Sequence, residues 1–240
     1  MIPLVTCLCP TFRRPSRLLA NSIACFNAQT YPAERRRLLI LDDSGELPPQ
    51  FGANWSIVSL ANRIESLPAK YNTMVDMVTG SDVIVVWEDD DAMLPLAIEH
   101  HVKALKDHLW SHPSFVYSTY RSPGKPKKES ARGRFHSSLA MQSGIAHWME
   151  TDQAKFDQML LAKLRSKHGP PGDPCDFGDP TYVFRWGSTE SYHGEAYAKT
   201  GEDEEWYARA GRETKPVKRD GPIVPKFDEE TLAIYATLGV

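Results

Sequence analysis

Apolar runs and amphipathic segments alternate along the first half of the chain, with short polar connections between them. The apolar runs predict buried strands at residues 4–8, 38–41, 57–60 and 83–87. Segments 15–26 and 67–78 lie between these runs and place apolar side chains at helical spacing. Strands that alternate with helices in this way are typical of a largely parallel sheet. The pattern therefore predicts an α/β fold in which helices flank a sheet.

Acidic residues follow two of the predicted strands directly. The strand at 38–41 runs into Asp42 and Asp43, and the strand at 83–87 runs into Glu88-Asp89-Asp90-Asp91. In open α/β sheets, ligands bind beyond the carboxyl ends of the strands. We therefore expect both acidic clusters to lie at one binding site.

The pattern after residue 91 is less regular. A helix after Pro95 is predicted to bury a stripe of apolar side chains, namely Leu94, Ile98, Val102, Leu105 and Leu109. Four histidines lie on or just after this helix and are expected to face solvent, namely His100, His101, His108 and His112. Further on, the sequence predicts a strand at 115–119, a basic loop at 121–135, a helix at 153–167, a strand at 182–186 and a mixed tail from 201.

Composition limits the class of protein. A chain of 240 residues with 41% hydrophobic residues can form one domain with a core, and its formal charge of −3 argues against wholesale wrapping of nucleic acid. No apolar run approaches the roughly 20 residues that span a bilayer, and the N-terminus lacks the features of a signal peptide. The spacing of Cys7, Cys9, Cys25 and Cys175 fits neither a zinc site nor a short disulfide. A cytoplasmic protein with reduced, structural thiols is therefore expected.

The run at 88–91 allows two interpretations. Acids are favoured in the first turn of a helix, which accounts for Asp91 and also for Asp90. Four consecutive acids at the end of a buried strand repel one another unless a cation lies among them. Because Mg²⁺ and Mn²⁺ prefer oxygen ligands and bind through few carboxylates plus substrate phosphates, the run favours a metal site.

Four segments, in order, resemble family 2 glycosyltransferases with the GT-A fold. Val5-Thr6-Cys7-Leu8-Cys9-Pro10-Thr11-Phe12-Arg13-Arg14-Pro15 is similar to the opening strand and Pro-Thr-aromatic turn of that family. Leu39-Ile40-Leu41-Asp42-Asp43-Ser44-Gly45 is similar to its Asp-Asp-Gly-Ser motif, with Ser and Gly exchanged. Leu67-Pro68-Ala69-Lys70-Tyr71-Asn72 resembles its Ala-Arg-Asn segment, and Val85-Val86-Trp87-Glu88-Asp89-Asp90-Asp91-Ala92-Met93-Leu94-Pro95 resembles its D-x-D motif and trailing proline. Each motif alone is common, but together they cover residues 4–110 at βαβ spacing.

The resemblance implies a GT-A domain over residues 1–200, with a nucleotide-sugar-binding half at 1–110, an acceptor-side half at 111–200 and a C-terminal extension at 201–240. It implies that a nucleotide-sugar donor contacts Pro10, Thr11, Arg13, Asp42, Asp43, Lys70, Asn72 and Asp89. It also implies that Mn²⁺ or Mg²⁺ is held by Glu88, Asp90 and His193. Glu88 stands where the family has Asp, which leaves open whether it binds the metal indirectly or contacts the sugar.

An inverting glycosyl transfer needs a carboxylate that takes the proton of the acceptor hydroxyl. Asp157 lies in a segment that resembles the family's base-bearing helix, although Phe156 stands where the family has Glu. Asp203, in Gly201-Glu202-Asp203-Glu204-Glu205-Trp206, has the literal Glu-Asp pair but lies late in the chain. The order of the surrounding segments favours Asp157 as the base.

The sequence thus predicts an inverting, metal-dependent transfer of sugar from a nucleotide-sugar, such as a UDP-sugar, to a hydroxyl acceptor. The expected acceptor is a glycan, a small molecule or a modified nucleic acid. The nucleic acid is included because the basic loop at 121–134 could guide a nucleic-acid strand. One alternative is a nucleic-acid-binding module that uses this loop. Another is a nucleotidyltransferase, which the absence of a Gly-rich, Lys-containing phosphate loop disfavours.

Overall fold

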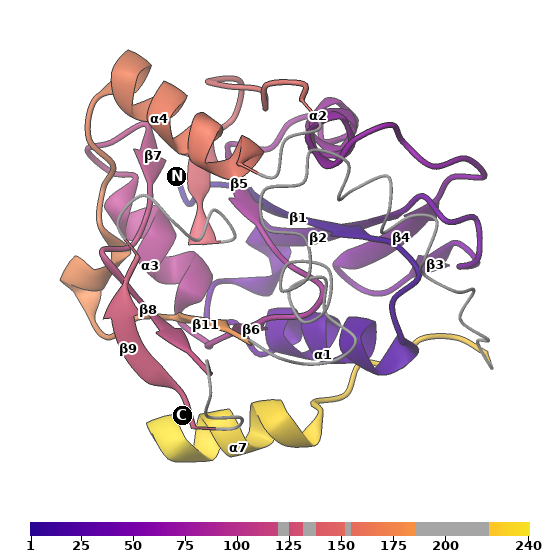
Figure 1. The fold of residues 1–240 in the computed structure, drawn as a ribbon. Coiled ribbons are helices and arrows are strands. Elements are labelled where there is room, and N and C mark those ends of the chain that lie inside the picture. The colour runs from indigo at the N-terminus through magenta and orange to yellow at the C-terminus, as the bar shows by residue number, and fades with distance from the viewer. Residues whose placement is uncertain (120–124, 132–137, 152–154, 186–220) are drawn as a thin grey trace.

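The fold is seen in a computed structural model that describes residues 1–119, 125–131, 138–151, 155–185 and 221–240 (Figure 1). Its centre is a seven-stranded sheet with the strand order β3-β4-β2-β1-β5-β10-β7. In that order the strands are Gln50–Phe51, Trp55–Ser59, Arg36–Asp42, Val5–Thr11, Val83–Val86, Ala140–Gln142 and Trp110–Ser111. The four strands from β4 to β5 are parallel, and β3 and β10 join them antiparallel. The predicted mixed α/β fold is therefore confirmed.

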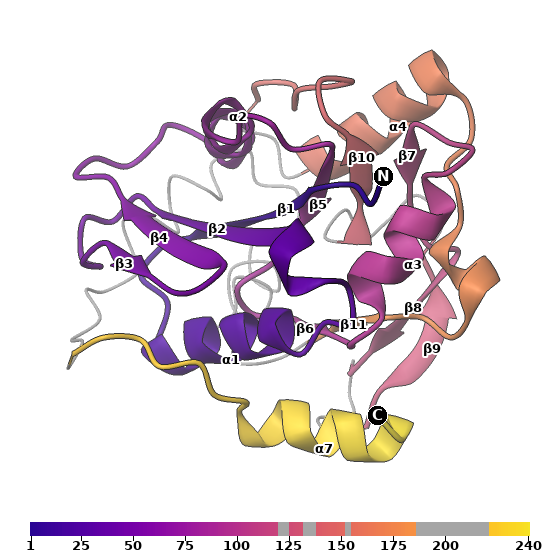
Figure 2. The same cartoon turned by 180° about the vertical axis from the view of Figure 1, so that it is seen from behind.

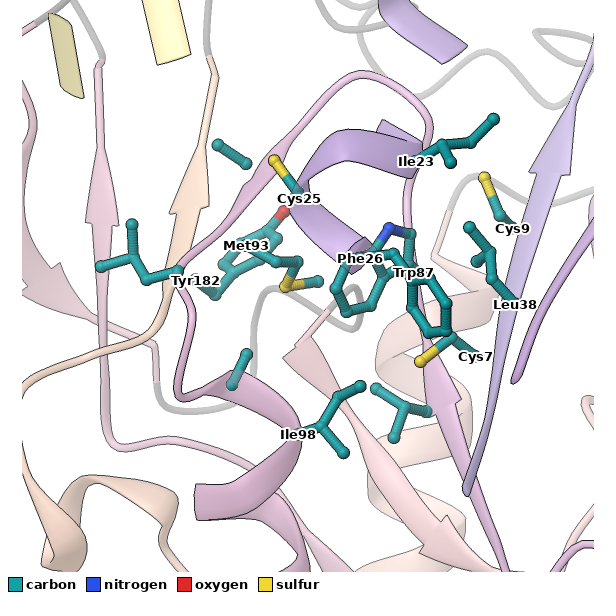
Figure 3. Packing of buried hydrophobic residues seen from close by; sticks show 14 of the residues in the cluster. Cys7, Cys9, Ile23, Cys25, Phe26, Leu38, Trp87, Met93, Ile98 and Tyr182 are labelled. Carbon is teal, nitrogen blue, oxygen red and sulfur yellow. The ribbon is translucent and has the colours of Figure 1, made fainter. Parts of the chain in front are cut away.

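The central strands are buried on both faces, which explains their continuous apolar runs. Successive residues of β1 point to opposite faces, so that Cys7 and Leu8 belong to different hydrophobic clusters. Helix α1 (Ser16–Asn27) covers the cluster that contains Cys7, which we call the α1-side core, and Figure 3 shows Phe26 of this helix against Trp87. Helices α2 (Leu67–Met77) and α4 (Phe156–His168) cover the other cluster, the α2-side core (Figures 1 and 2).

A second sheet has the strand order β6-β11-β8-β9. Its strands are Ala92–Met93, Tyr182–Phe184, Phe115–Ser118 and Lys127–Ser130. Strand β9 lies within the segment that the sequence predicts as a loop, and it pairs antiparallel with β8. The sequence analysis missed this strand because it is rich in lysine. Exposed lysines fit a strand here because β9 lies at the edge of the sheet.

The described end of the chain packs onto the core rather than standing apart from it. Helix α7 (Glu229–Leu238) buries Ile234 and Tyr235 in the α1-side core, and Tyr235 Oη donates to the Met93 carbonyl at 2.7 Å. The segment before it runs beside α1, where the Asp228 amide donates to Asn21 at 3.1 Å (Figure 2). The division of the chain at residue 200 stays a prediction, but α7 belongs to the same core as the sheet.

Two smaller sequence predictions differ from the structure. Strand β1 continues through Pro10 to Thr11. The pairing of β1 with β5 ends at Val86, before Pro10, so the missing amide hydrogen of Pro10 costs no hydrogen bond between these two strands. Helix α3 is Ala97–Ala104 and ends before Leu109, whose side chain is 39% exposed. All four cysteines are free thiols, as predicted. Within the described ranges, no helix has both the length and the apolar character that crossing a membrane requires.

The prediction of solvent-facing histidines after Pro95 is wrong for His100, His101 and His112, which are buried. Helix α3 is enclosed between β7 and the short helix η3 (Pro174–Phe177), so its polar side also meets protein. His101 Nδ1 lies 2.7 Å from the Ser111 hydroxyl. Burial, followed by the charges of His112 and His100, lowers the pKa of His101 from 6.5 to about 3.

This lowered pKa predicts an acid-sensitive fold. Between pH 6.5 and about 3 the unfolded chain binds a proton at His101 that the folded chain does not, so stability falls as the pH falls through this window. From pH 7.5 to 5.0 this residue should cost about 2 kcal/mol. His101→Asn, which keeps a partner for Ser111, should remove that part of the loss in urea unfolding at the two pH values. An equal loss in the variant would contradict the assignment.

Candidate active site

The acidic clusters lie together at the carboxyl edge of the large sheet. Strands β1 and β2 end side by side, with Thr11 opposite Asp42, and β5 pairs with β1 up to Leu8 opposite Val86. The four acids at 88–91 therefore leave the sheet beside the turn that follows β1. This confirms that the two acidic clusters share one edge, as expected from the strand order.

Asp42 organises the turn after β2. Its carboxylate accepts from the Ser44 amide at 3.2 Å and hydroxyl at 2.7 Å, from the Leu47 amide at 3.2 Å and from the Ser59 hydroxyl at 3.1 Å. Gly45 within this turn has φ +70°, and a Cβ there would meet the Ala61 carbonyl at 3.3 Å. The Asp-Ser-Gly order thus suits a turn in which the acid caps its own loop.

Asp43 forms a buried ion pair with Lys70 of α2. Lys70 Nζ lies 2.6 Å from Asp43 Oδ1 and donates to the Thr11 carbonyl at 2.5 Å, and Asp43 Oδ2 accepts from the Ile64 amide at 3.0 Å. Burial lowers the pKa of Lys70, while the charge of Asp43 opposes that shift. The pair ties α2, the turn after β1 and the loop before α2 into one unit.

Arg13 and Phe12 form the rim beside this pair. Arg13 has φ 50°, the one positive φ among the described non-glycine residues, and its Nε lies 2.8 Å from Glu46. The Arg63 guanidinium lies 3.6 Å from the centroid of the Phe12 ring, and that of Arg13 lies 5.2 Å from it. Strained backbone of this kind is often found at functional sites. The rim therefore places two guanidinium groups beside one aromatic ring at this edge of the sheet.

Each acid of the run at 88–91 meets a group from another element. Glu88 Oε1 accepts from Tyr71 Oη of α2 at 2.8 Å. Asp91 accepts from the Tyr182 hydroxyl and, at 2.8 Å, from the Arg185 amide, both at strand β11. The Asp91 contacts attach the acidic run to the second sheet.

Arg14 binds the two middle acids. Its Nε lies 3.1 Å from both Asp89 oxygens, and its Nη2 lies 3.0 Å from Asp90 Oδ2. Burial raises the pKa of Asp89, and the Arg14 charge opposes the shift. Burial, followed by the charges of Asp90, Asp91 and Asp89, raises the pKa of Glu88 well above its usual range. The four carboxyl groups are thus crowded, and Arg14 supplies a positive charge to two of them.

The segment around Trp148 reaches the acidic run through Tyr71. The Trp148 ring stacks on the Tyr71 ring with centroids 4.7 Å apart and an interplanar angle of 11°. Asn72, predicted to contact the donor, has its amide side chain in two bonds to the backbone of Trp148, at 3.0 and 2.8 Å. The 67–72 segment therefore couples Glu88 to the segment around Trp148.

Asp157, the predicted base, lies in the first turn of α4, where its carboxylate accepts from the Gln158 amide at 2.7 Å. Burial raises the pKa of its carboxyl group above the usual range, and the hydrogen bond from the Gln158 amide opposes that shift. The preceding residue, Phe156, packs in the α2-side core with Tyr71 and Trp148. The start of α4 thus packs on the same cluster as the Tyr71 partner of Glu88. Asp203 and His193 lie outside the described residues.

The donor set of the acidic run fits a hard divalent cation. Glu88, Asp89 and Asp90 offer carboxylate oxygens, and their crowding is the electrostatic situation that a cation relieves. Over the described ranges, no three Asp, Glu, His or Cys side chains are already arranged to hold a metal ion.

Sequence reasoning missed three groups of this site. It gave no role to Arg14, to Tyr71 or to Tyr182, although all three hydrogen-bond the acids at 88–91. Arg13 and Arg14 are adjacent in the turn after the first predicted strand, so the sequence did place both arginines near the acids. It did not show that Arg14 is the one that turns toward them. Nothing in the sequence marked the two tyrosines as more than core residues.

The Lys70–Asp43 pair yields a stability prediction. Lys70→Met leaves a buried carboxylate without its cation and should cost about 3–5 kcal/mol in urea unfolding. The double variant Lys70→Met/Asp43→Asn should recover part of this loss, since both charges are then gone. Lys103→Met removes a lysine that is 47% exposed and pairs with Glu99, and it should change stability by less than about 1 kcal/mol. Additive single-variant effects would contradict the coupling of the buried pair.

At the level of sequence, no protein-family model and no curated protein matches the chain. Similar folds occur among solved structures. The mannosyltransferase PcManGT from Pyrobaculum calidifontis, in complex with GDP-Man and Mn²⁺, matches with a TM-score of 0.55 and 16% identity, over 98% of this chain and 70% of that one. S. aureus TarS 1–349 in complex with UDP-GlcNAc matches with a TM-score of 0.59 and 12% identity, over 79% of this chain and 60% of that one. The chain therefore has a glycosyltransferase fold of the GT-A-like type, a mixed sheet flanked by helices.

Proposed function

We propose that this protein is a divalent-metal-dependent glycosyltransferase that moves a sugar from a nucleotide-sugar to a hydroxyl acceptor with inversion. The observation that carries the proposal is the placement of Asp42, Asp43 and the acids at 88–91 at one edge of a glycosyltransferase-type sheet. A donor with a diphosphate requires both a polar pocket and compensation of negative charge, and this edge offers groups for both.

The turns after β1 and β2 are the proposed nucleotide pocket. The Lys70–Asp43 pair and the Asp42 hydrogen bonds hold these turns in place, so their backbone and the Arg13 rim are preorganised for a ligand. Thr11 and Pro10 lie at the end of β1 in this pocket. In this proposal Asp42 and Lys70 act mainly by shaping the pocket, because their charged atoms already bind the protein itself.

Asp90 and Glu88 are the proposed protein ligands of Mn²⁺ or Mg²⁺, with Asp89 on the donor side. A cation bound there would neutralise the charge that develops on the leaving nucleoside diphosphate. The protein's part is to hold these carboxylates at the end of β5 through Tyr71 and Arg14.

Asp157 is the proposed general base. It takes the proton of the acceptor hydroxyl while that oxygen attacks the anomeric carbon and the diphosphate leaves from the opposite face. The raised pKa of Asp157 and the packing of α4 against the core beside Tyr71 support this role. The acceptor-side half at 111–200 then supplies both the base and, through Trp148, a wall of the site.

Thermal unfolding with UDP, GDP, CMP and ADP, each with and without Mn²⁺, tests the donor site. One nucleotide with Mn²⁺ should raise the Tm by about 5–10 °C at a hundredfold excess over its Kd, because it binds only the folded state. Asp90→Asn should lose the Mn²⁺-dependent part of the shift. If no nucleotide shifts the Tm of the wild type, the glycosyltransferase proposal fails.

Turnover of the donor identified in this way tests the base. Asp157→Asn should lower kcat by about 10²–10⁴-fold with little change in KM for the donor, because the base acts in the transfer step and not in donor binding. Asp176→Asn, at an exposed position of η3, serves as the matched control and should keep wild-type turnover. Loss of activity in Asp203→Asn together with full activity in Asp157→Asn would move the role of the base to Asp203.

A further inference from the structure

Arg14 is the only described residue whose positive charge is hydrogen-bonded to the middle acids of the run at 88–91. Its side chain is buried, with the whole residue 7% exposed, and it bridges Asp89 and Asp90 from the turn after β1. Its hydrogen bonds to both aspartates are charge-assisted, and its loss would leave two buried carboxyl groups without this partner.

The two acids that Arg14 bridges are held unequally. Asp89 receives Nε at both oxygens, whereas Asp90 receives Nη2 at one oxygen, Oδ2. The neighbouring acids have other partners, since Glu88 is bound by Tyr71 and Asp91 by strand β11. Asp90 is thus the acid of the run whose contact with Arg14 can be given up while Arg14 stays anchored on Asp89.

We propose that Arg14 is an internal counter-ion that competes with the divalent cation for Asp90, so that the cation binds tightly only together with the donor diphosphate. This inference rests on the proposed function, because it assumes a cation at Asp90. Arg14 is a positioning residue in this scheme, since it acts on the cation through the two aspartates.

Competition follows from charge and space. A cation on Asp90 would lie close to the guanidinium that already donates to the same carboxylate, and two positive charges at that separation repel each other in a poorly solvated site. Without a cation, the guanidinium is the positive charge that lies between the two carboxyl groups of Asp89 and Asp90. The same residue therefore stabilises the metal-free site and weakens metal binding to it.

A donor diphosphate would reverse this balance. Its negative charges at the site would compensate both the cation and the guanidinium after Nη2 has left Asp90. Binding of the cation and of the nucleotide would then favour each other, and by linkage each raises the affinity of the other by the same factor. Arg14 would in this way make the protein respond to the metal–nucleotide pair rather than to free metal.

The test is a titration of the full chain with Mn²⁺ in the absence of nucleotide, in which the spectroscopic signal of free Mn²⁺ measures binding. Arg14→Met should bind Mn²⁺ at least about tenfold more tightly than the wild type, because the competing charge is gone. Arg17→Met is the matched control, since it removes an exposed arginine from the first turn of α1 and should stay within about twofold of the wild type. Arg14→Gln, which keeps hydrogen-bond donors without the charge, gives the same readout if Arg14→Met does not fold.

Added nucleoside diphosphate completes the test. It should tighten Mn²⁺ binding by the wild type much more than by Arg14→Met, and the additional change Asp90→Asn should abolish the gain of Arg14→Met. If Arg14→Met and Arg17→Met bind Mn²⁺ equally, the competition is refuted while the metal site stands. If no variant binds Mn²⁺ with or without nucleotide, the metal dependence in the proposed function fails as well.

Discussion

Four consecutive carboxyl groups at the end of a buried strand are the constraint on which the rest of this structure depends. Ionised carboxylates that leave water without partners cost several kcal/mol each, so the chain has to bring hydrogen-bond donors or cations to β5. It does so from three directions, with Tyr71 from α2, Arg14 from the turn after β1, and Tyr182 from strand β11. The positions of these elements around the sheet edge are therefore coupled to the acids that the site uses.

The end of β2 follows the same principle with a different outcome. Asp42 and Asp43 are also buried acids, but Asp42 is satisfied by its own turn and Asp43 by Lys70. Their charges are matched within the protein, which makes this side of the edge rigid. Among the described residues, the acids at 88–91 outnumber the cations that bind them, and the proposed divalent ion would relieve this crowding. The two acidic clusters at one edge thus differ in how far the protein itself balances their charge.

The segment around Trp148 is joined to the acidic edge by packing rather than by charge. Tyr71 touches Glu88 with its hydroxyl and Trp148 with its ring, and the Asn72 side chain holds the Trp148 backbone. A shift of the segment around Trp148 would therefore move the Tyr71 side chain and change its hydrogen bond to Glu88. Helix α7 and Arg185 play a similar part on the far side, where Arg185 pairs with Asp228 and Glu230 and its amide binds Asp91.

The sequence by itself determined the alternation of the four parallel strands with α1 and α2, and it placed both acidic clusters at one sheet edge, because hydrophobic periodicity and strand direction are local properties. It could not tell which acids are already satisfied: Asp42 and Asn72 look like ligand contacts in a motif but bind their own chain. Nor could it place His101 inside, since the burial of α3 depends on β7 and also on η3, which lies far along the chain. Only the folded structure decided these points, and long-range packing turned Arg14 inward toward Asp89 and Asp90.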